Sequence, residues 1–370
     1  MSTSELSPEQ LVQKQSLPGA HLSTEACLAQ AKQLQGKVVV VTGAGGGFGR
    51  NYSVLAASHG AKVIASDINL AAVQATVDEI VQAGGQAIAT RCDTADWDSQ
   101  VAMFRLAINT YSVVDVVVAN AGVTEIPGWF DEKLGENEEP VKPPMATVDI
   151  NLLGASYTAR LAFYHLKKNP STGLKSIVLL GSMSSFFGIP MAPMYSMSKH
   201  AMIGLFRSLY HSATPAGINI NIVCPWFCAT GILSAPTRIA VAGLPLATVD
   251  NVVQGIFKGS SDPSFTGNIL GIDAAGVLCI PYDAFIVGEG GYYRAFLNRA
   301  AYTISTVRTI KDVIAAFGDA RKPSPTKMAV KTVGLGALAL SAYSAAVGAT
   351  DVGISGLVGR GAAAATLLVI

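Results

Sequence analysis

Tyr195 and Lys199 lie four residues apart in a segment with the hydrophobic period of a helix, so we expect both side chains on one helix face. A free phenol titrates near pH ~10 and is a poor base at neutral pH. A neighbouring ammonium group stabilises the phenolate and brings the phenol pKa toward the working range. The pair therefore predicts proton transfer to and from a substrate oxygen, although tyrosine and lysine at this spacing also occur on ordinary amphipathic helices.

A glycine-rich loop at residues 42–49 stands between a β-branched run and a segment of helical period. Glycine allows the tight turn, the close approach of the backbone to a pyrophosphate and the close packing of helix on sheet that dinucleotide binding requires. The first turn of the following helix offers free N–H groups and the positive end of its dipole to phosphates. The candidate cofactor-binding residues of this loop are Gly43, Gly47, Phe48 and Gly49.

An acidic residue, Asp67, ends the second β-branched run. A carboxylate at the tip of the second strand accepts hydrogen bonds from adenosine ribose hydroxyls and repels a 2′-phosphate. No basic residue stands beside it at Ile68 or in the loop at Gly46, so the sequence predicts NAD as the cofactor rather than NADP. A simple helix cap is the alternative role for Asp67. Asp93, after the third run, fits either a contact to the adenine edge or a turn.

Short β-branched runs alternate with longer helical segments through residues 37–275. This alternation predicts an α/β domain in which helices cover both faces of a parallel sheet. The runs are apolar at successive positions, as expected for strands that are buried on both faces. The glycine loop after the first strand favours a doubly wound, Rossmann-type sheet over a barrel. The predicted strands are 37–42, 62–66, 87–91, 113–119, 175–181, 218–223 and 268–272, and the clearest helical segments are 145–168 and 195–213.

Four further segments carry polar residues beside the predicted strands and helices. They are Gly181-Ser182-Met183-Ser184-Ser185, Val148-Asp149-Ile150-Asn151-Leu152, Ala119-Asn120-Ala121-Gly122 and Pro225-Trp226-Phe227-Cys228-Ala229-Thr230. Together with the glycine loop and the tyrosine–lysine pair, they make residues 37–275 resemble the short-chain dehydrogenase/reductase family in its single-domain form. Within it, the chain is most similar to fungal NAD-type alcohol dehydrogenases of secondary metabolism and to 15-hydroxyprostaglandin dehydrogenase-like members.

The resemblance implies a role for each residue that would meet the substrate. Tyr195 is the general acid/base on the substrate oxygen. Lys199 binds the nicotinamide ribose and lowers the pKa of the tyrosine. Ser182 orients the substrate oxygen through a hydrogen bond, because its spacing to Tyr195 fits best. Ser184 is the second candidate, and Ser185 takes a place that the family often fills with glycine.

The other matched residues are implied to shape the cofactor site. Asn151 holds a kinked helix and a water that links the lysine to solvent. Asn120 and Gly122 wall the cofactor cleft. Pro225 belongs to the cofactor site, and Thr230 contacts the nicotinamide carboxamide or a phosphate.

One position departs from the family pattern. Trp226 stands where the family usually has glycine, after the proline of the sixth strand. Its indole is large and needs a partner for its N–H, so we expect it to narrow the nicotinamide side of the cleft. His200 adjoins Lys199, but it points about 100° away on the helix, which favours a packing or surface role.

Composition excludes several classes of function. The formal net charge is +1, which gives no electrostatic reason to expect nucleic acid or acidic partners. The five cysteines include no Cys-x-x-Cys pair, so no metal site is predicted and reduced thiols in a cytoplasmic protein are expected. The beginning of the chain is polar and shows no secretory signal.

The segments outside the predicted dehydrogenase domain differ from it in composition. Residues 1–36 are expected to form an N-terminal arm, and residues 276–370 a C-terminal extension with a helix at 292–317. Residues 332–350 carry no charge and are mostly small, so they fit a membrane contact that attaches the protein to an intracellular membrane, a docking helix or a low-complexity tail. An acidic insertion at 125–144 is interpreted as a solvated loop in preference to a substrate lid.

The combined prediction is an oxidoreductase that transfers a hydride between NAD and a secondary alcohol or ketone. The substrate is expected to be a lipophilic small molecule, the cofactor favours the oxidising direction, and the family suggests a homo-oligomer. Two alternatives remain. The first is an NADP-dependent ketoreductase, which the carboxylate of Asp67 disfavours. A non-catalytic, membrane-attached NAD-binding scaffold would have degenerate catalytic residues, whereas Asn151, Ser182, Tyr195 and Lys199 are all present.

Overall fold

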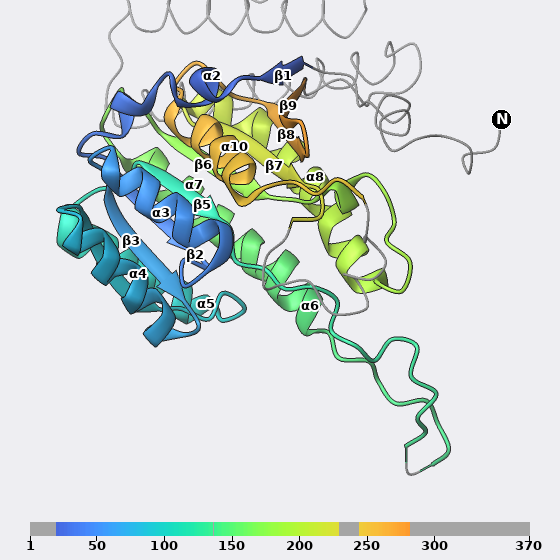
Figure 1. The fold of residues 1–370 in the computed structure, drawn as a ribbon. Helices are drawn as coiled ribbons and strands as arrows, with labels where there is room; N and C mark the ends of the chain where they lie inside the picture. The colour runs from blue at the N-terminus through green and yellow to red at the C-terminus, as the bar shows by residue number, and fades with distance from the viewer. Residues whose placement is uncertain (1–19, 136, 229–243, 282–370) are drawn as a thin grey trace, which may run out of the picture. The chain divides into compact units, whose positions relative to one another are not determined.

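A sheet of nine strands forms the frame of the protein, in a computed structural model that describes residues 20–135, 137–228 and 244–281. The strands lie in the order β1-β9-β8-β7-β6-β5-β2-β3-β4 (Figure 1). The strands from β8 to β4 are parallel, whereas β9 and β1 join antiparallel at one edge. Their bounds are β1 Ala20–Leu22, β2 Val38–Thr42, β3 Lys62–Asp67, β4 Gln86–Arg91, β5 Val116–Ala119, β6 Ser176–Leu180, β7 Asn219–Pro225, β8 Asn268–Asp273 and β9 Gly276–Pro281.

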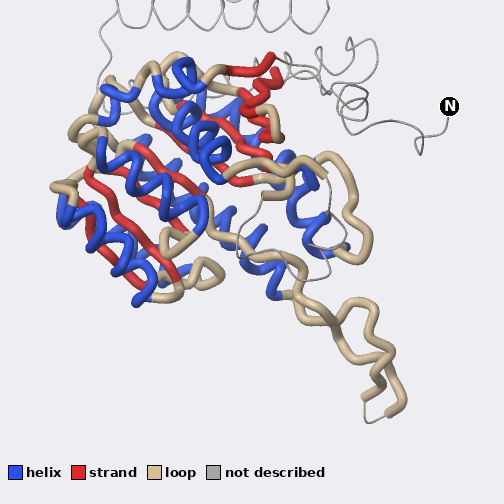
Figure 2. Tube along the Cα trace, in the orientation of Figure 1, coloured by secondary structure: helices blue, strands red, loops and turns tan. Residues whose placement is uncertain are grey.

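Helices cover both faces of this sheet (Figure 2). Their bounds are α2 Thr24–Leu28, η2 Ala31–Leu34, α3 Gly47–Ser58, α4 Leu70–Gln82, α5 Trp97–Tyr111, α6 Ala146–Val148, η3 Asp149–Gly154, α7 Ala155–Lys168, η4 Met183–Ser185, α8 Pro193–Ala213, η5 Thr214–Ala216 and α10 Val249–Ser261. The helices α3, α4 and α10 share one buried apolar cluster with the sheet, and α5, α7 and α8 share the other. The sheet is therefore the middle layer of three.

The central strand β2 shows why apolar runs become buried strands. All five of its residues are buried. Val39 and Val41 belong to the cluster with α3 and α10, while Val40 belongs to the cluster with α5 and α7. Successive side chains of a strand face opposite sides, so a strand covered on both faces must be apolar at every position.

The predicted fold class, an α/β domain with a doubly wound parallel sheet, is confirmed. Each of the seven predicted strands is present close to its expected ends, and both of the clearest helical segments are helical. The segment predicted at 145–168 is divided, because the π-helical turn η3 separates α6 from α7.

The sheet extends past the boundaries drawn from the sequence. β1 comes from the predicted N-terminal arm and β9 from the predicted C-terminal extension, and they pair with Ala20 opposite Cys279. β1 is too short to show alternation, and the turn before β9 contains no Asn-Gly or Asp-Gly pair. That turn is closed by the Asp273 carboxylate, which accepts from the backbone N–H of Ala275 at 2.8 Å and of Gly276 at 3.1 Å.

Several predicted segments lie outside the described residues. They include most of the N-terminal arm, the helix expected at 292–317 and the uncharged stretch at 332–350. The chain divides into two compact units, 1–285 and 286–370, and all described residues lie in the first. Among the helices of the described ranges, none combines the length and apolar character needed to cross a bilayer.

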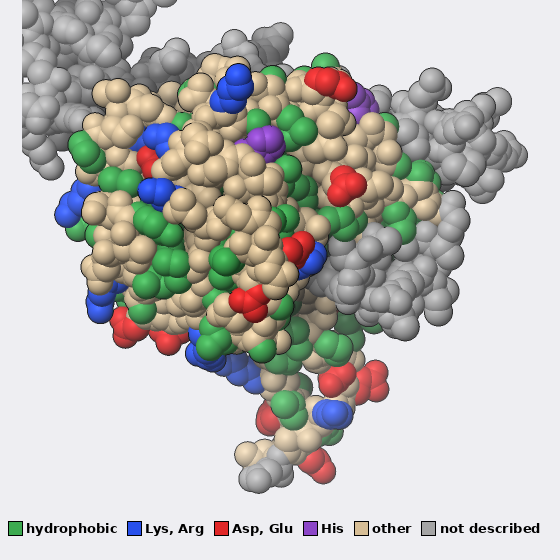
Figure 3. All heavy atoms as spheres, turned by 60° about the vertical axis from the view of Figure 1, so that its left-hand side comes forward, with side chains coloured by type: hydrophobic (Ala, Val, Ile, Leu, Met, Phe, Trp, Pro, Cys, Tyr) green, Lys and Arg blue, Asp and Glu red, His purple; other side chains and the backbone are tan. Residues whose placement is uncertain are grey.

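The insertion between β5 and α6 extends away from the sheet in its described part (Figures 1 and 2). Trp129 and Phe130 are exposed on it, and acidic side chains gather on its projecting part at the bottom of Figure 3. Outer residues of this insertion therefore lie in solvent, as expected, but its first residue, Glu125, contacts α8.

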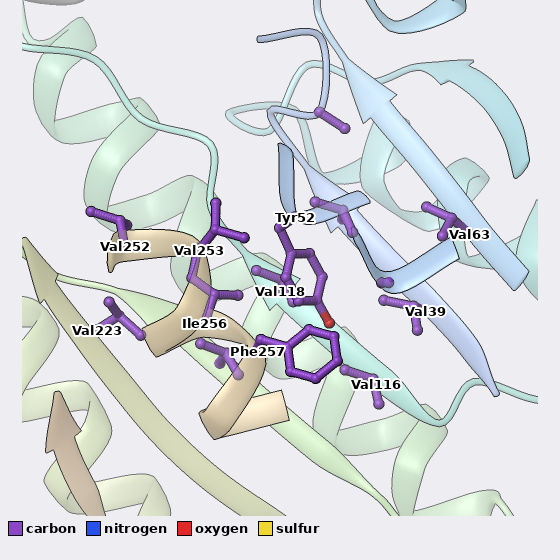
Figure 4. Close-up of a cluster of buried hydrophobic side chains, with 14 of the residues drawn as sticks. Val39, Tyr52, Val63, Val116, Val118, Val223, Val252, Val253, Ile256 and Phe257 are labelled. Atoms are coloured by element: carbon purple, nitrogen blue, oxygen red, sulfur yellow. The ribbon is translucent and has the colours of Figure 1, made fainter. Parts of the chain in front are cut away.

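The helix α10 holds the glycine-bearing helix α3 against the sheet. In Figure 4, Tyr52 of α3 and Phe257 of α10 lie close together, near Val116 and Val118 of β5. Both rings are fully buried, and the Tyr52 hydroxyl donates to Ser260 Oγ at 2.9 Å. Aromatic side chains bury large areas, so this contact fixes the position of α3 and of the glycine loop at its start.

Replacement of Phe257 by alanine tests this packing. Loss of a fully buried ring should lower the free energy of unfolding by about 3–5 kcal/mol, because a cavity remains. Val81→Ala, at an exposed position of α4, should change it by about 0.5 kcal/mol or less. Urea unfolding followed by circular dichroism measures both, and equal losses would contradict the buried contact.

Candidate functional site

The predicted site residues that the structure describes gather around the carboxyl ends of neighbouring strands β7, β6, β5, β2, β3 and β4. Ligands of open α/β sheets bind at this edge, where the strand order reverses. The reversal here falls between β2 and β5, because β3 and β4 follow β2 outward while β6 and β7 follow β5 the other way. Asn120 Nδ2 donates to the carbonyl oxygens of Thr42 at 2.9 Å and Gly43 at 3.0 Å. Asn120 therefore joins the two strands at the crevice.

The glycine loop is closely packed on one side and open on the other. Gly43 has φ +67, and a Cβ there would approach the backbone that follows β5 at 2.9 Å. A Cβ on Gly49 would overlap the Gly43 carbonyl oxygen, and Phe48 packs against the apolar cluster. By contrast, a Cβ on Gly46 or Gly47 would meet no atom of the described chain within 4 Å. The open side leaves room for a phosphate at the first turn of α3.

Asp67 faces this loop from the end of β3. Its Oδ2 accepts from the N–H of Gly45 at 3.0 Å, and its Oδ1 accepts from the N–H of Asn69 at 3.0 Å. The cap of α4 is Asn69, whose side chain accepts from the N–H of Ala72 at 3.1 Å. Asp67 is therefore not the helix cap that the sequence allowed as an alternative.

Asp93 adopts the turn role. Its Oδ1 accepts from the N–H of Ala95 at 3.0 Å, and its own N–H donates to Ser99 Oγ at 3.0 Å. These bonds fit the turn, and the contact of Asp93 with the adenine edge stays a prediction.

Tyr195 and Lys199 lie near the start of α8 and share one helix face. Lys199 is only 6% exposed, and its Nζ donates to the Leu180 carbonyl oxygen at the end of β6, at 3.0 Å. The same Nζ lies 5.8 Å from the centre of the Tyr195 ring. The exposed His200 lies on another face, with Nδ1 2.8 Å from the Ser196 carbonyl oxygen, which agrees with a surface role.

Burial controls the protonation of both groups. It raises the pKa of the Tyr195 phenol above its ordinary value, and a hydrogen bond with Ser182 opposes the rise. It lowers the pKa of Lys199 to about 8. Removal of the phenol from water is the largest cause of this rise, and the effect of the ammonium on the phenol pKa stays a prediction. A phenol that keeps its proton is suited to donate it to a substrate oxygen.

The structure separates the three candidate serines. Ser182 lowers the pKa of the Tyr195 phenol, and its Oγ accepts from the N–H of Ser184 at 3.1 Å. Ser184 Oγ instead donates to Ser196 Oγ at 3.2 Å. Ser185 Oγ accepts from the N–H of Ser182 at 3.2 Å and lies beside the buried thiol of Cys224. Among the three, Ser182 is the serine that affects the pKa of the phenol, and its contact with the substrate oxygen stays a prediction.

Asn151 lies in the π-helical turn η3 and is buried. Its Oδ1 accepts from the N–H of Val123 at 2.8 Å, and its Nδ2 donates to the Val123 carbonyl at 2.9 Å and to Ser198 Oγ at 3.3 Å. A Cβ on Gly122 would lie 3.1 Å from Asn151 Oδ1 and 3.6 Å from Lys199 Nζ. Asn151 thus joins η3, α8 and the segment after β5.

The segment after β7 is anchored at its first residues. The Pro225 carbonyl oxygen accepts from Ser182 Oγ at 3.5 Å, and the N–H of Trp226 donates to the Ile272 carbonyl at 2.7 Å. Trp226 is partly buried against the apolar cluster. Thr230 lies outside the described residues.

One contact at the site has no counterpart in the sequence patterns. Glu125 accepts from the N–H of Tyr195 at 2.6 Å, across 70 residues of chain. The only signal was an acid at the start of a polar insertion. In the described ranges, no cluster of three or more His, Cys, Asp or Glu side chains could hold a metal ion.

Comparisons with known proteins agree on one family. The family described as short chain dehydrogenase matches residues 37–238. The 5'-hydroxyaverantin dehydrogenase of Dothistroma septosporum is 28% identical over 72% of this chain and 94% of its own. The cyclohexanol dehydrogenase of an Acinetobacter species is 30% identical over 66% of this chain and 96% of its own. A short-chain type dehydrogenase/reductase from Mycobacterium marinum has the same fold, with TM-score 0.60 and 24% identity over 67% of this chain and 98% of its own.

The family match covers more than half of the chain, and these relatives are matched over nearly their whole length. The resemblance inferred from the motifs is confirmed. The chain belongs to the short-chain dehydrogenase family, and it is an oxidoreductase that acts on alcohol or ketone groups with a nicotinamide cofactor.

Proposed function

We propose that the protein transfers a hydride between NAD and a secondary alcohol or ketone, with Tyr195 as the general acid/base. The main support is the buried ammonium of Lys199, which lies 5.8 Å from the centre of the Tyr195 ring, together with Ser182, which lowers the pKa of the phenol. Two hydroxyl groups directed at one substrate oxygen, with a positive charge behind them, suit the interconversion of an alcohol and a carbonyl group.

Each of these side chains has a task in the reaction. In reduction, the protonated phenol of Tyr195 donates its proton to the developing alkoxide, while Ser182 donates a hydrogen bond to the same oxygen. In oxidation, the alcohol proton passes to the phenolate of Tyr195. Lys199 stabilises that phenolate through its positive charge. The bound nicotinamide supplies or accepts the hydride, and the protein contributes position and electrostatics.

The glycine loop and Asp67 support NAD as the cofactor. The open side at Gly46 and Gly47 offers space for the pyrophosphate against the start of α3. Each Asp67 carboxylate oxygen accepts one backbone hydrogen bond, and each has capacity for another. The carboxylate therefore keeps acceptors for the ribose hydroxyls, and its charge opposes a 2′-phosphate.

A lipophilic substrate is supported by the segment between β6 and α8. Phe187 is 53% exposed and Met191 is 71% exposed on this segment, which connects Ser182 to Tyr195. Exposed apolar side chains so close to the reacting groups favour an apolar ligand. The two curated relatives are named for cyclohexanol and 5'-hydroxyaverantin. With NAD as the cofactor, oxidation of a lipophilic secondary alcohol is the favoured direction.

Titration of the purified protein with NADH and with NADPH, followed by energy transfer from tryptophan to nicotinamide, tests the cofactor. NADH should bind more tightly. Asp67→Ala should narrow the preference by about tenfold, or about 1.4 kcal/mol, because the repulsion of the 2′-phosphate is lost. Tighter binding of NADPH by the wild type would favour a ketoreductase, and an unchanged ratio in the variant would remove Asp67 from the ribose site.

Replacement of Tyr195 by phenylalanine tests the acid/base assignment. The variant should lose about 10²–10⁴-fold in kcat with secondary alcohols, since the proton acceptor is gone. The NADH affinity should stay near that of the wild type. Stopped-flow or steady-state absorbance of NADH measures turnover, and a variant as active as the wild type would refute the role of Tyr195. A wild type that binds NADH without any turnover would favour a binding scaffold.

Paired serine variants test the separation of the three serines. Ser182→Ala should lower kcat by about 10²-fold or more, because a donor to the developing oxyanion is removed. Ser184→Ala should have a smaller effect, since its hydroxyl is directed to Ser196. Steady-state kinetics of both variants with one alcohol give the comparison. A larger loss in Ser184→Ala would reverse the assignment.

A further inference from the structure

Glu125 contacts the backbone of the proposed acid/base from a different part of the chain. Its Oε2 accepts from the N–H of Tyr195 at 2.6 Å, and its Oε1 accepts from the N–H of Met194 at 3.4 Å. Glu125 follows β5, at the start of the acidic insertion, and its side chain is half-buried. The carboxylate thus links the insertion directly to the first turn of α8.

The first turn of α8 needs such a partner. The first four N–H groups of any helix lack a partner within the helix. α8 begins at Pro193, which has no N–H, and the residue before it, Ala192, has no side-chain oxygen to act as a cap. The next two N–H groups belong to Met194 and Tyr195, and Glu125 accepts from both. Its negative charge also meets the positive end of a helix of 21 residues.

The residues on either side of Glu125 are fixed to α6. The N–H of Ile126 donates to Thr147 Oγ1 at 3.0 Å, and that hydroxyl donates to the Thr124 carbonyl oxygen at 3.3 Å. Thr147 is fully buried. The backbone that carries Glu125 therefore has a firm base, although the insertion beyond it is exposed.

The segment between β6 and α8 also contacts the first turns of α8, through Ser196. Ser196 Oγ accepts from the N–H of Ile189 at 2.9 Å and from Ser184 Oγ at 3.2 Å. This contact fixes the helix to the segment after β6, but it does not involve the peptide group of Tyr195. Glu125 accepts from the N–H of Tyr195, and Ser198 Oγ, within the same helix, donates to the Tyr195 carbonyl oxygen at 2.8 Å.

We propose that Glu125 is a positioning residue for Tyr195, and that its carboxylate holds the first turn of α8 so that the phenol meets Ser182 and the substrate oxygen. The proposal rests on the proposed function, because it concerns the same proton transfer. A displacement of about 1 Å at a reacting group can cost about 10²-fold in rate. The cofactor loop is built on β2 and α3, so a loosened α8 should affect turnover far more than NADH binding.

Two substitutions at Glu125 and one matched control test the proposal. Glu125→Ala removes both acceptor atoms, whereas Glu125→Gln keeps one amide oxygen and loses the charge. Asp96→Ala is the control, because the Asp96 carboxylate caps α5 in the same way, accepting from the N–H groups of Asp98 at 2.9 Å and Ser99 at 3.4 Å. For each variant we would measure kcat, KM, NADH affinity and the thermal midpoint.

Glu125→Ala should lower kcat by about 10- to 100-fold, with a smaller loss in Glu125→Gln and NADH affinity within about twofold of the wild type. Asp96→Ala should lower the thermal midpoint to a similar extent and leave kcat within about twofold. If Glu125→Ala lowers only the thermal midpoint, as the control does, Glu125 is an ordinary cap and the proposal is wrong.

Amide hydrogen exchange separates this proposal from the proposed function. Exchange of the Met194 and Tyr195 amides should become about tenfold faster in Glu125→Ala, because both N–H groups lose their acceptor. This readout does not depend on turnover. A wild type that oxidises no alcohol would count against the proposed function, whereas unchanged exchange in the variant would overturn the role of Glu125.

Discussion

The buried ammonium of Lys199 is the constraint on which the rest of the site depends. A charged amine leaves water only at a large cost, which must be offset by nearby acceptors, and burial here lowers its pKa to about 8. The Leu180 carbonyl accepts from Nζ at 3.0 Å, so α8 has to keep its position against the end of β6. Gly122 lies beside the same nitrogen, and a Cβ there would contact Nζ at 3.6 Å and crowd Asn151 Oδ1 at 3.1 Å. The buried charge of Lys199 thus constrains the positions of α8, the end of β6 and the segment after β5 relative to one another.

The cofactor loop and the proton-transfer group come from distant segments, yet they meet at one edge of a rigid sheet. Asn120 joins the ends of β2 and β5, and the contact between Tyr52 and Phe257 holds α3 in place behind the loop. Sites built on strands and helices keep their geometry better than sites built on loops. The outer residues of the insertion at 125–144 are exposed and lie outside this frame, and substrate choice is expected to depend on that insertion and on the loop after Thr230.

Patterns with a regular period were the most predictable from the sequence. The strands and helices followed from apolar runs and helical spacing, because both report burial directly. Spacing to Tyr195 also selected Ser182, the one of the three serines that affects the pKa of the phenol. Contacts without a period could not be predicted: Glu125 reaches Tyr195 across 70 residues, and β1 has only three residues. The raised pKa of Tyr195 could not be predicted from the sequence either, because the burial that causes it depends on the whole fold.

The pairing of β1 with β9 joins the first described strand to the last, with Ala20 opposite Cys279. Because the chain is made from its N-terminus, β1 is synthesised long before its partner strand exists. Contacts so far apart in sequence carry a large loop-closure cost and form slowly. Because β9 must first fold back on β8 through the Asp273 turn, this edge closes only after translation has passed Pro281. The edge formed by β1 and β9 can therefore be completed only late in the synthesis of the described residues.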